Sequence, residues 1–125
     1  TDALLVGAGS LGQALLGYTG FRKYSLSIGL AFDIDPEKIG RAVHGVDVYP
    51  MDKMAEVVRD RKLKIGILTV PAEAAQVCAD ALVASGIVGI WNFTPVQLAV
   101  PPGVIVQNID LAQSLAVLTH EIACS

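Results

Sequence analysis

The stretch VGAGSLGQALL, residues 6–16, decides how this chain folds. A short apolar run at residues 3–6 leads into Gly7, Gly9 and Gly12, which have the G-x-G-x-x-G spacing, and a helix-forming run begins at Ser10. The first glycine of this motif allows a tight turn after a strand, the second lets the backbone approach a pyrophosphate, and the third allows close helix–sheet packing. The stretch therefore predicts a strand, a phosphate-binding turn and a helix whose positive end faces an anion.

An acidic residue follows at the spacing that is typical of dinucleotide-binding domains. A second apolar run, residues 28–32, ends at Asp33, about twenty residues after Gly12, where a carboxylate can accept hydrogen bonds from an adenosine ribose. The alternative is that Asp33 caps a helical turn beginning at Pro36, but Asp35 is better placed for that role. We therefore predict a dinucleotide site in which Asp33 repels the 2′-phosphate of NADPH and favours NADH.

The composition limits the classes of protein to which the chain can belong. It has 125 residues, of which 53% are hydrophobic and 17% charged, and its formal net charge is −3. No apolar run approaches the roughly 18 residues that a membrane-spanning helix needs, and the negative charge offers no basic surface for DNA. We expect one cytoplasmic domain over residues 1–125 that neither enters a membrane nor binds DNA by itself. No charged stretch is followed by an apolar core, so we expect no signal peptide, and because the chain starts directly before a strand, we expect a fragment.

The cysteines and histidines do not form a convincing metal or redox site. Cys78 falls in the apolar stripe of a predicted helix and has no C-x-x-C partner, so we interpret it as a small core residue. His120, Glu121 and Cys124 resemble the start of a metal-binding helix, but the second histidine is missing. We therefore predict no metal site.

Strands and helices alternate along the rest of the chain. Helices are predicted at residues 10–18, 36–40 (a single turn), 52–62 with Asp52 as its cap, and 72–85, and strands at residues 46–49, 65–70, 87–93 and 104–106. This alternation predicts an α/β fold of the Rossmann type, a doubly wound parallel sheet with ligands beyond the carboxyl ends of its strands. The predicted strand ends at Gly7, Asp33, Thr69 and Phe93 should face one crevice.

The final helix differs from the others because it is apolar around most of its circumference. Asp110 is a good N-cap, and apolar residues then recur from Leu111 to Ile122 on more than one stripe. Either the domain itself covers this helix, or a second subunit does. We favour the second reading and predict a homodimer through residues 111–122.

Five segments resemble one known family: VGAGSLGQALL, AFDIDPEKIG, ILTVPAEAAQ, GIWNFTPV and QNIDL. In order, and over essentially the whole chain, they are similar to the dinucleotide-binding domain of Rex, a family of bacterial redox-sensing transcriptional repressors. The resemblance implies that this domain binds NADH and NAD, that its last helix is exchanged between the two subunits of a dimer, and that the repressor leaves DNA when NADH accumulates. Operator DNA would be bound by an amino-terminal winged-helix domain, which these 125 residues do not include.

The resemblance also implies which residues bind the cofactor. The pyrophosphate would lie at Gly7, Ala8, Gly9, Ser10, Leu11 and Gly12, the adenosine at Asp33 and Ile34, and the remainder of the cofactor along Thr69, Val70 and Pro71, with Asn92, Phe93 and Thr94 near the nicotinamide. Tyr18 and Asp110 match family positions linked to the conformational switch. Leu111 stands where some members have Phe, which leaves open how the partner helix meets the nicotinamide.

Two other functions remain open from the residues alone. The chain has the features expected of the cofactor domain of a dehydrogenase, but its predicted strand ends carry no His or Lys to act as an acid or base beside a nicotinamide. We therefore predict no catalytic residues. A CoA-binding domain would share the glycine turn and would not need Asp33 at a ribose.

Overall fold

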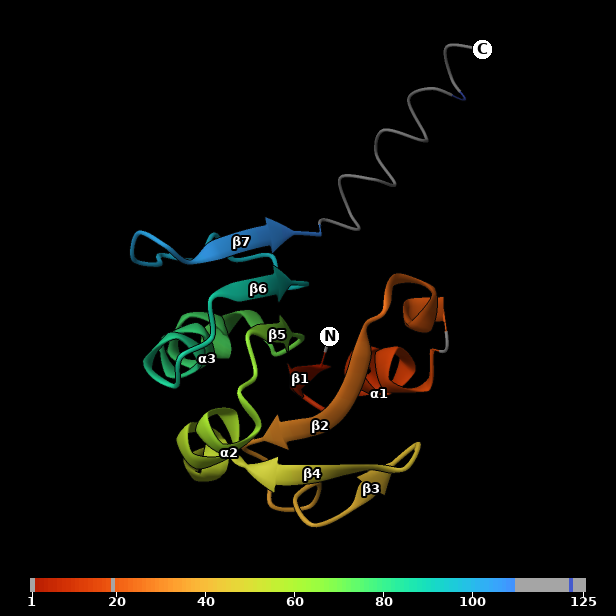
Figure 1. Ribbon diagram of the computed structural model, residues 1–125. Helices are drawn as coiled ribbons and strands as arrows, with labels where there is room; N and C mark the ends of the chain where they lie inside the picture. Colours follow the sequence, from red (N-terminus) through yellow and green to blue (C-terminus); the bar gives the residue numbers. More distant parts are fainter. Residues whose placement is uncertain (1, 19, 110–121, 123–125) are drawn as a thin grey trace.

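The computed structural model describes residues 2–18, 20–109 and 122, and this part of the chain is built around one sheet. Its strands are β1 (Asp2–Val6), β2 (Ser27–Asp33), β3 (Ala42–Val43), β4 (Val46–Pro50), β5 (Ile65–Leu68), β6 (Gly89–Asn92) and β7 (Ile105–Asn108). Its α-helices are α1 (Ser10–Gly17), α2 (Met54–Arg61) and α3 (Ala72–Ala84), and its 3-10 helices are η1 (Gly20–Tyr24) and η2 (Met51–Lys53). Figure 1 shows the sheet edge-on between its helices.

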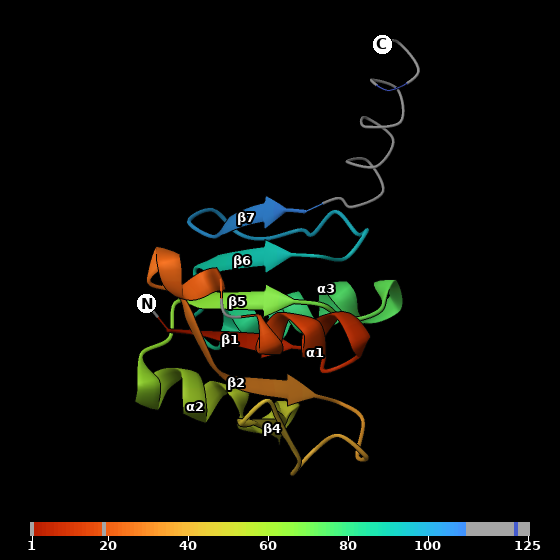
Figure 2. The ribbon, with the colours of Figure 1, turned by 90° about the vertical axis from the view of Figure 1, so that its right-hand side faces the viewer.

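The strand order is β3-β4-β2-β1-β5-β6-β7, and all neighbouring pairs are parallel except β3 and β4. Helices α2 and α3 cover one face of the sheet and α1 covers the other, as Figures 1 and 2 show from two sides. The predicted doubly wound parallel sheet is therefore confirmed. Strand β3 was not predicted, because two residues are too few to show an alternating pattern. It pairs with β4 through a turn at His44 and Gly45, which both have positive φ.

The central strand β1 shows why the apolar runs of this chain are continuous rather than alternating. Leu4 and Val6 belong to the core beneath α2 and α3, whereas Ala3 and Leu5 belong to the core beneath α1. All four side chains are at most 1% exposed. A strand that is buried on both faces has no polar side to display, which is the usual pattern for a central parallel strand.

Several predicted element ends differ from the structure. Asp52 does not cap the following helix: α2 begins at Met54, after η2, and no side chain caps either element. The predicted helical turn at residues 36–40 is a hydrogen-bonded turn, in which the carbonyl of Asp35 accepts the N–H groups of Lys38 and Ile39. The strand predicted to run to residue 70 ends at Leu68, and the strand predicted from residue 87 begins at Gly89.

Two glycines of the first turn are required by the protein's own packing. Gly7 has a φ of +101°, and a Cβ there would lie 2.8 Å from the carbonyl oxygen of Thr69. A Cβ at Gly12 would overlap the carbonyl oxygen of Gly7, so α1 can approach the end of β1 only without a side chain at that position. The sequence motif is therefore explained in part by the fold itself.

Replacing Gly12 with Ala should therefore destabilise the fold. The added methyl group has no space against backbone atoms, and overpacking of this kind typically costs about 1–3 kcal/mol. Urea unfolding followed by circular dichroism measures the change, with Gly89→Ala as the control because its Cβ would meet its nearest neighbours at 3.9 Å. Equal unfolding midpoints for the two variants would contradict the packing argument.

Candidate nucleotide-binding site

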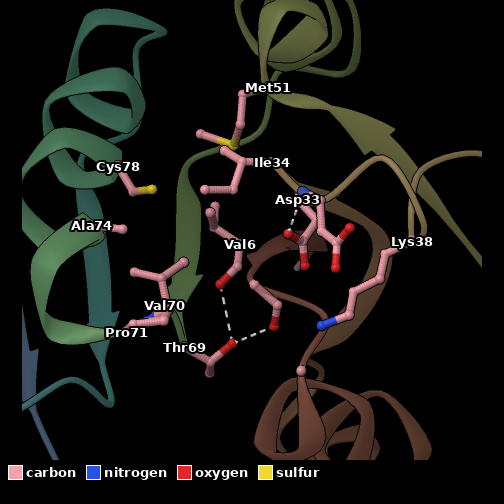
Figure 3. A pocket seen from close by; sticks show the side chains of 13 residues that line it. Val6, Asp33, Ile34, Lys38, Met51, Thr69, Val70, Pro71, Ala74 and Cys78 are labelled. Atoms are coloured by element: carbon pink, nitrogen blue, oxygen red, sulfur yellow. Dashed lines mark hydrogen bonds between the residues drawn. The ribbon is translucent and has the colours of Figure 1, made fainter.

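A cavity of about 500 Å³ opens at the carboxyl ends of β1, β2 and β5. The chain leaves β1 for β2 on one side and later returns to β5 on the other, so this is the switch point at which open α/β sheets bind ligands. One end of the cavity is apolar and is lined by Ile34, Met51, Val70, Pro71, Ala74 and Cys78. The other end is polar and is lined by Gly7, Gly9, Asp33, Asp35, Lys38 and Thr69. Figure 3 shows the two groups facing each other.

The Asp33 carboxylate holds the glycine turn from the side of β2. One of its oxygens accepts the backbone N–H of Ala8 at 2.8 Å, and the other accepts the N–H of Asp35 at 3.0 Å. The residue is 9% exposed, so these bonds are largely shielded from water. A carboxylate has about four acceptor positions, and the two that remain can accept ribose hydroxyls. The cap of the following turn is Asp35, whose side chain accepts the N–H of Glu37.

Thr69 holds the same turn from the side of β5. Its hydroxyl lies 2.6 Å from the carbonyl oxygen of Gly7 and 3.0 Å from that of Val6, and donates to them. The backbone N–H of Thr69 also donates to Val6, at 2.9 Å. Thr69 therefore positions the turn, and its hydroxyl proton is already used before any ligand arrives.

Gly9 differs from Gly7 and Gly12, because nothing in the protein requires a glycine there. Its φ of −77° is open to any residue, and a Cβ would meet one atom within 4 Å, the Nζ of Lys38 at 3.9 Å. Gly9 also precedes α1, whose first turn has no side-chain cap. A bare backbone, a free helix N-terminus and a nearby ammonium group form a surface suited to an anion.

Cys78 lies in the wall of the apolar end and is 3% exposed. Burial raises the pKa of its thiol, and the negative charge of Asp33 raises it further. The thiol therefore stays protonated at neutral pH and acts as a small apolar group. Its predicted place in the core is confirmed, and it also borders the cavity.

The structure brings about half of the sequence-predicted site residues together. Gly7, Gly9, Asp33, Ile34, Thr69, Val70 and Pro71 line the cavity, and Ala8, Ser10, Leu11 and Gly12 belong to the same turn and helix start without lining it. Six lining residues were not predicted as site residues: Val6, Asp35, Lys38, Met51, Ala74 and Cys78. Met51 was within reach of sequence reasoning, because it directly follows β4, whose carboxyl end lies at the same edge of the sheet.

Asn92, Phe93 and Thr94 follow β6 and do not line this cavity. The Asn92 side chain is buried, and its amide donates to the carbonyl of Val96 and to the side chain of Asn108. Its oxygen accepts both the N–H and the hydroxyl of Thr94. All four hydrogen-bonding positions of this amide are used within the protein, so Asn92 positions the loop that follows β6.

An aromatic chain runs from this loop across the α1 face of the sheet. The ring centroids of Phe93 and Trp91 are 4.9 Å apart, those of Trp91 and Phe21 are 5.5 Å apart, and those of Phe21 and Tyr18 are 4.9 Å apart. Phe93 is partly buried, and Tyr18 is 60% exposed. Asp110, the other position linked by resemblance to the switch, lies outside the described residues.

Other candidate features can be judged only for the described part of the chain. Within residues 2–18, 20–109 and 122, no group of three or more His, Cys, Asp or Glu is arranged to hold a metal ion. His120, Glu121 and Cys124 lie outside those residues, as does nearly all of the predicted dimerisation helix. No helix in the described ranges is long and apolar enough to span a membrane. His44 packs against Gly17 at the end of α1.

This fold and this cavity define a Rossmann-type nucleotide-binding domain. The chain belongs to the CoA binding domain family, whose model matches residues 1–96. Its similarity to Rex repressors, inferred from the five sequence segments, is also confirmed. Redox-sensing transcriptional repressors Rex from Desulfitobacterium hafniense and Treponema denticola are 49% and 48% identical to it, over 94% and 93% of this chain. The chain spans little more than half of each relative, 56% and 55%.

Solved structures agree with the sequence comparison. The crystal structure of RSP, a Rex-family repressor, is 38% identical, with a TM-score of 0.91 over 97% of this chain and 58% of that one. RSP has also been solved with β-NADH and with β-NAD+ and operator DNA, and these structures match with TM-scores of 0.91 and 0.90. A UDP-D-quinovosamine 4-dehydrogenase from Vibrio fischeri, 16% identical with a TM-score of 0.64, shares the fold alone.

Replacing Gly9 with Ala tests whether this glycine is required for ligand binding and not for folding. The methyl group fits the ligand-free protein, so the unfolding midpoint should stay within about 0.5 kcal/mol of the wild type. Binding of NADH, measured by fluorescence titration, should weaken at least tenfold, because the backbone is no longer bare where a phosphate approaches. Unchanged binding would mean that no ligand group lies against Gly9.

Proposed function

We propose that this chain is the NAD(H)-sensing domain of a Rex-type transcriptional repressor, which releases operator DNA when NADH binds. The observation that carries the proposal is the Asp33 carboxylate against the glycine turn, at the switch point of a chain that is 49% identical to a Rex repressor. A Rex-family repressor of the same fold has been solved with NADH and with NAD+ and operator DNA, which supports both cofactors.

The two ends of the cavity suggest how the cofactor lies. The adenine ring would fill the apolar end, between Ile34 and Val70, where burial of its faces is favourable. The adenosine ribose would lie at Asp33, and the pyrophosphate would lie over Gly9 and the start of α1. The nicotinamide would then extend toward the end of β6, where Phe93 is partly buried beside Trp91.

A sensing role requires binding without chemistry. Asp33, Thr69 and Asn92 lie at or directly after the carboxyl ends of β2, β5 and β6, and all three hold backbone or side-chain groups of the protein itself. Thr69 and Asn92 have no group that ionises at neutral pH, and the Asp33 carboxylate would lie at the adenosine ribose and not beside the nicotinamide, where hydride transfer normally uses an acid or base. The relatives that match over most of this chain are named as repressors, which supports the same reading.

CoA is the second candidate ligand, and the name of the matching family model favours it. CoA and NADH share adenosine and a pyrophosphate, so both fit the cavity as described. They differ at the ribose, where CoA carries a phosphate that would approach the Asp33 and Asp35 carboxylates. We therefore expect CoA to compete with NADH only weakly.

Titration of the chain with NADH, NADPH and CoA tests this function. We expect NADH to bind more tightly than NADPH, because Asp33 accepts the 2′-hydroxyl and repels a 2′-phosphate. Asp33→Ala should weaken NADH binding by about 1.5–3 kcal/mol, the usual contribution of a charge-assisted hydrogen bond, and should reduce the discrimination against NADPH.

The control for this experiment is Asp52→Ala, which removes an exposed carboxylate outside the cavity. Because Asp33 also accepts two backbone N–H groups, unfolding of each variant has to be measured alongside binding. A wild-type chain that prefers CoA to NADH would overturn the proposed function. Unchanged NADPH discrimination in D33A would remove Asp33 from the ribose site.

We also propose that the repressor is a homodimer held by the helix at residues 111–122, with a winged-helix domain outside these 125 residues binding the DNA. The support for the dimer is the apolar sequence of that segment, and the support for the DNA partner is the RSP complex with operator DNA. Burying each Leu or Ile side chain contributes about 1.5–3 kcal/mol before the costs of association.

Replacing Leu115 and Leu118 with Asp should therefore give monomers or insoluble protein. Sedimentation velocity at micromolar concentration distinguishes monomer from dimer. The matched control changes the polar residues Gln113 and Thr119 of the same segment to Asp, which adds the same charge without removing apolar groups. A wild-type chain that sediments as a monomer would contradict the dimer.

A further inference from the structure

Lys38 lines the polar end of the cavity, and the described part of the chain gives it no partner of opposite charge. No carboxylate among the described residues lies within 4.0 Å of its ammonium group, although Asp33 and Asp35 line the same cavity. Its side chain is partly buried, so it is not simply a solvated surface lysine. A cation that is partly removed from water is stabilised when an anion lies beside it.

The backbone of Lys38 is held in place by a sequence of short turns. Asp33 accepts the N–H of Asp35, and the carbonyl of Asp35 accepts the N–H of Lys38 at 3.0 Å. The turn is then tied to the sheet, since the N–H of Gly40 donates to the carbonyl of Val48 at 2.9 Å. Lys38 is therefore positioned by the same aspartate that holds the glycine turn.

The ammonium group points toward Gly9. A Cβ built on Gly9 would lie 3.9 Å from the Nζ of Lys38, and no other heavy atom comes within 4 Å of that position. Figure 3 shows the Lys38 side chain on the same side of the cavity as Asp33, with its nitrogen turned inward. Gly9 is also the glycine of the motif that the fold does not require, and it lines the same cavity as Lys38.

We propose that Lys38 is a binding residue for the pyrophosphate of the nucleotide and not for a phosphate on its ribose. The inference rests on the proposed function. A phosphate at the ribose would approach the carboxylates of Asp33 and Asp35, whereas a pyrophosphate over Gly9 meets the ammonium group alone. Lys38 therefore strengthens binding of every nucleotide that carries the pyrophosphate, and it does not choose between NADH and NADPH.

The experiment compares Lys38→Met with the wild type, using ADP-ribose and adenosine as probes beside NADH and NADPH. ADP-ribose has the pyrophosphate and adenosine does not, so K38M should bind ADP-ribose, NADH and NADPH about tenfold more weakly and adenosine equally well. Lys38→Arg keeps the charge and should retain most of the affinity. The control Lys64→Met removes an exposed charge beside the amino end of β5, whereas the cavity lies at the carboxyl ends of the strands.

The outcomes separate this inference from the proposed function. Equal affinities of K38M and the wild type for ADP-ribose would overturn the inference while leaving the function intact. A loss confined to NADPH would also overturn it, because that pattern assigns Lys38 to the 2′-phosphate. A loss for adenosine as large as for ADP-ribose would indicate a structural role instead. A wild-type chain that binds none of the four probes would overturn the proposed function and, with it, this inference.

Discussion

The whole site depends on the way the glycine turn after β1 is held by its two neighbouring strands. On one side the Asp33 carboxylate accepts the N–H of Ala8, and on the other the Thr69 hydroxyl donates to the carbonyl of Gly7. Asp33 is 25 positions from Ala8 in the sequence and Thr69 is 62 positions from Gly7, yet both side chains lie within 3 Å of the turn. The turn is thus positioned before any nucleotide arrives, which lowers the entropic cost of binding.

This arrangement gives Asp33 two roles that are difficult to separate by mutation. As a structural residue it satisfies the buried N–H of Ala8, whose loss of a partner would cost about 1–3 kcal/mol, and the partly buried N–H of Asp35. As a ligand residue it presents its two remaining acceptor positions to the cavity. Lys38 adds the opposite charge at the same end without pairing with the carboxylate, so the polar end of the cavity carries an acceptor and a cation at separate places. A nucleotide with a ribose hydroxyl beside a pyrophosphate matches this pair.

The sequence was sufficient for those features that depend on local patterns. The glycine spacing, the apolar runs of buried strands and the acidic residue at the end of β2 depend only on residue types and their spacing along the chain, so the sequence identifies them. The role of Asn92 was beyond this reasoning, because it depends on the register that places Asn108 beside it on β7. The same is true of Lys38, whose position near Gly9 follows from the path of the turn at residues 35–40. Asp52 failed as a cap because a 3-10 turn precedes α2.

Under the proposed function, the residues that line the cavity are not the residues that distinguish NADH from NAD+. NADH and NAD+ are identical in the adenosine and pyrophosphate that the cavity would hold, so Asp33, Gly9 and Lys38 strengthen both cofactors equally. Discrimination has to come from groups beside the nicotinamide, whose ring is neutral in NADH and cationic in NAD+. An apolar neighbour such as Phe93 penalises the cationic ring, because removing a charge from water is costly without a counter-charge. Every tenfold preference for NADH over NAD+ requires only about 1.4 kcal/mol of binding free energy, so a small change in the polarity around the nicotinamide suffices to change the ratio of the two affinities.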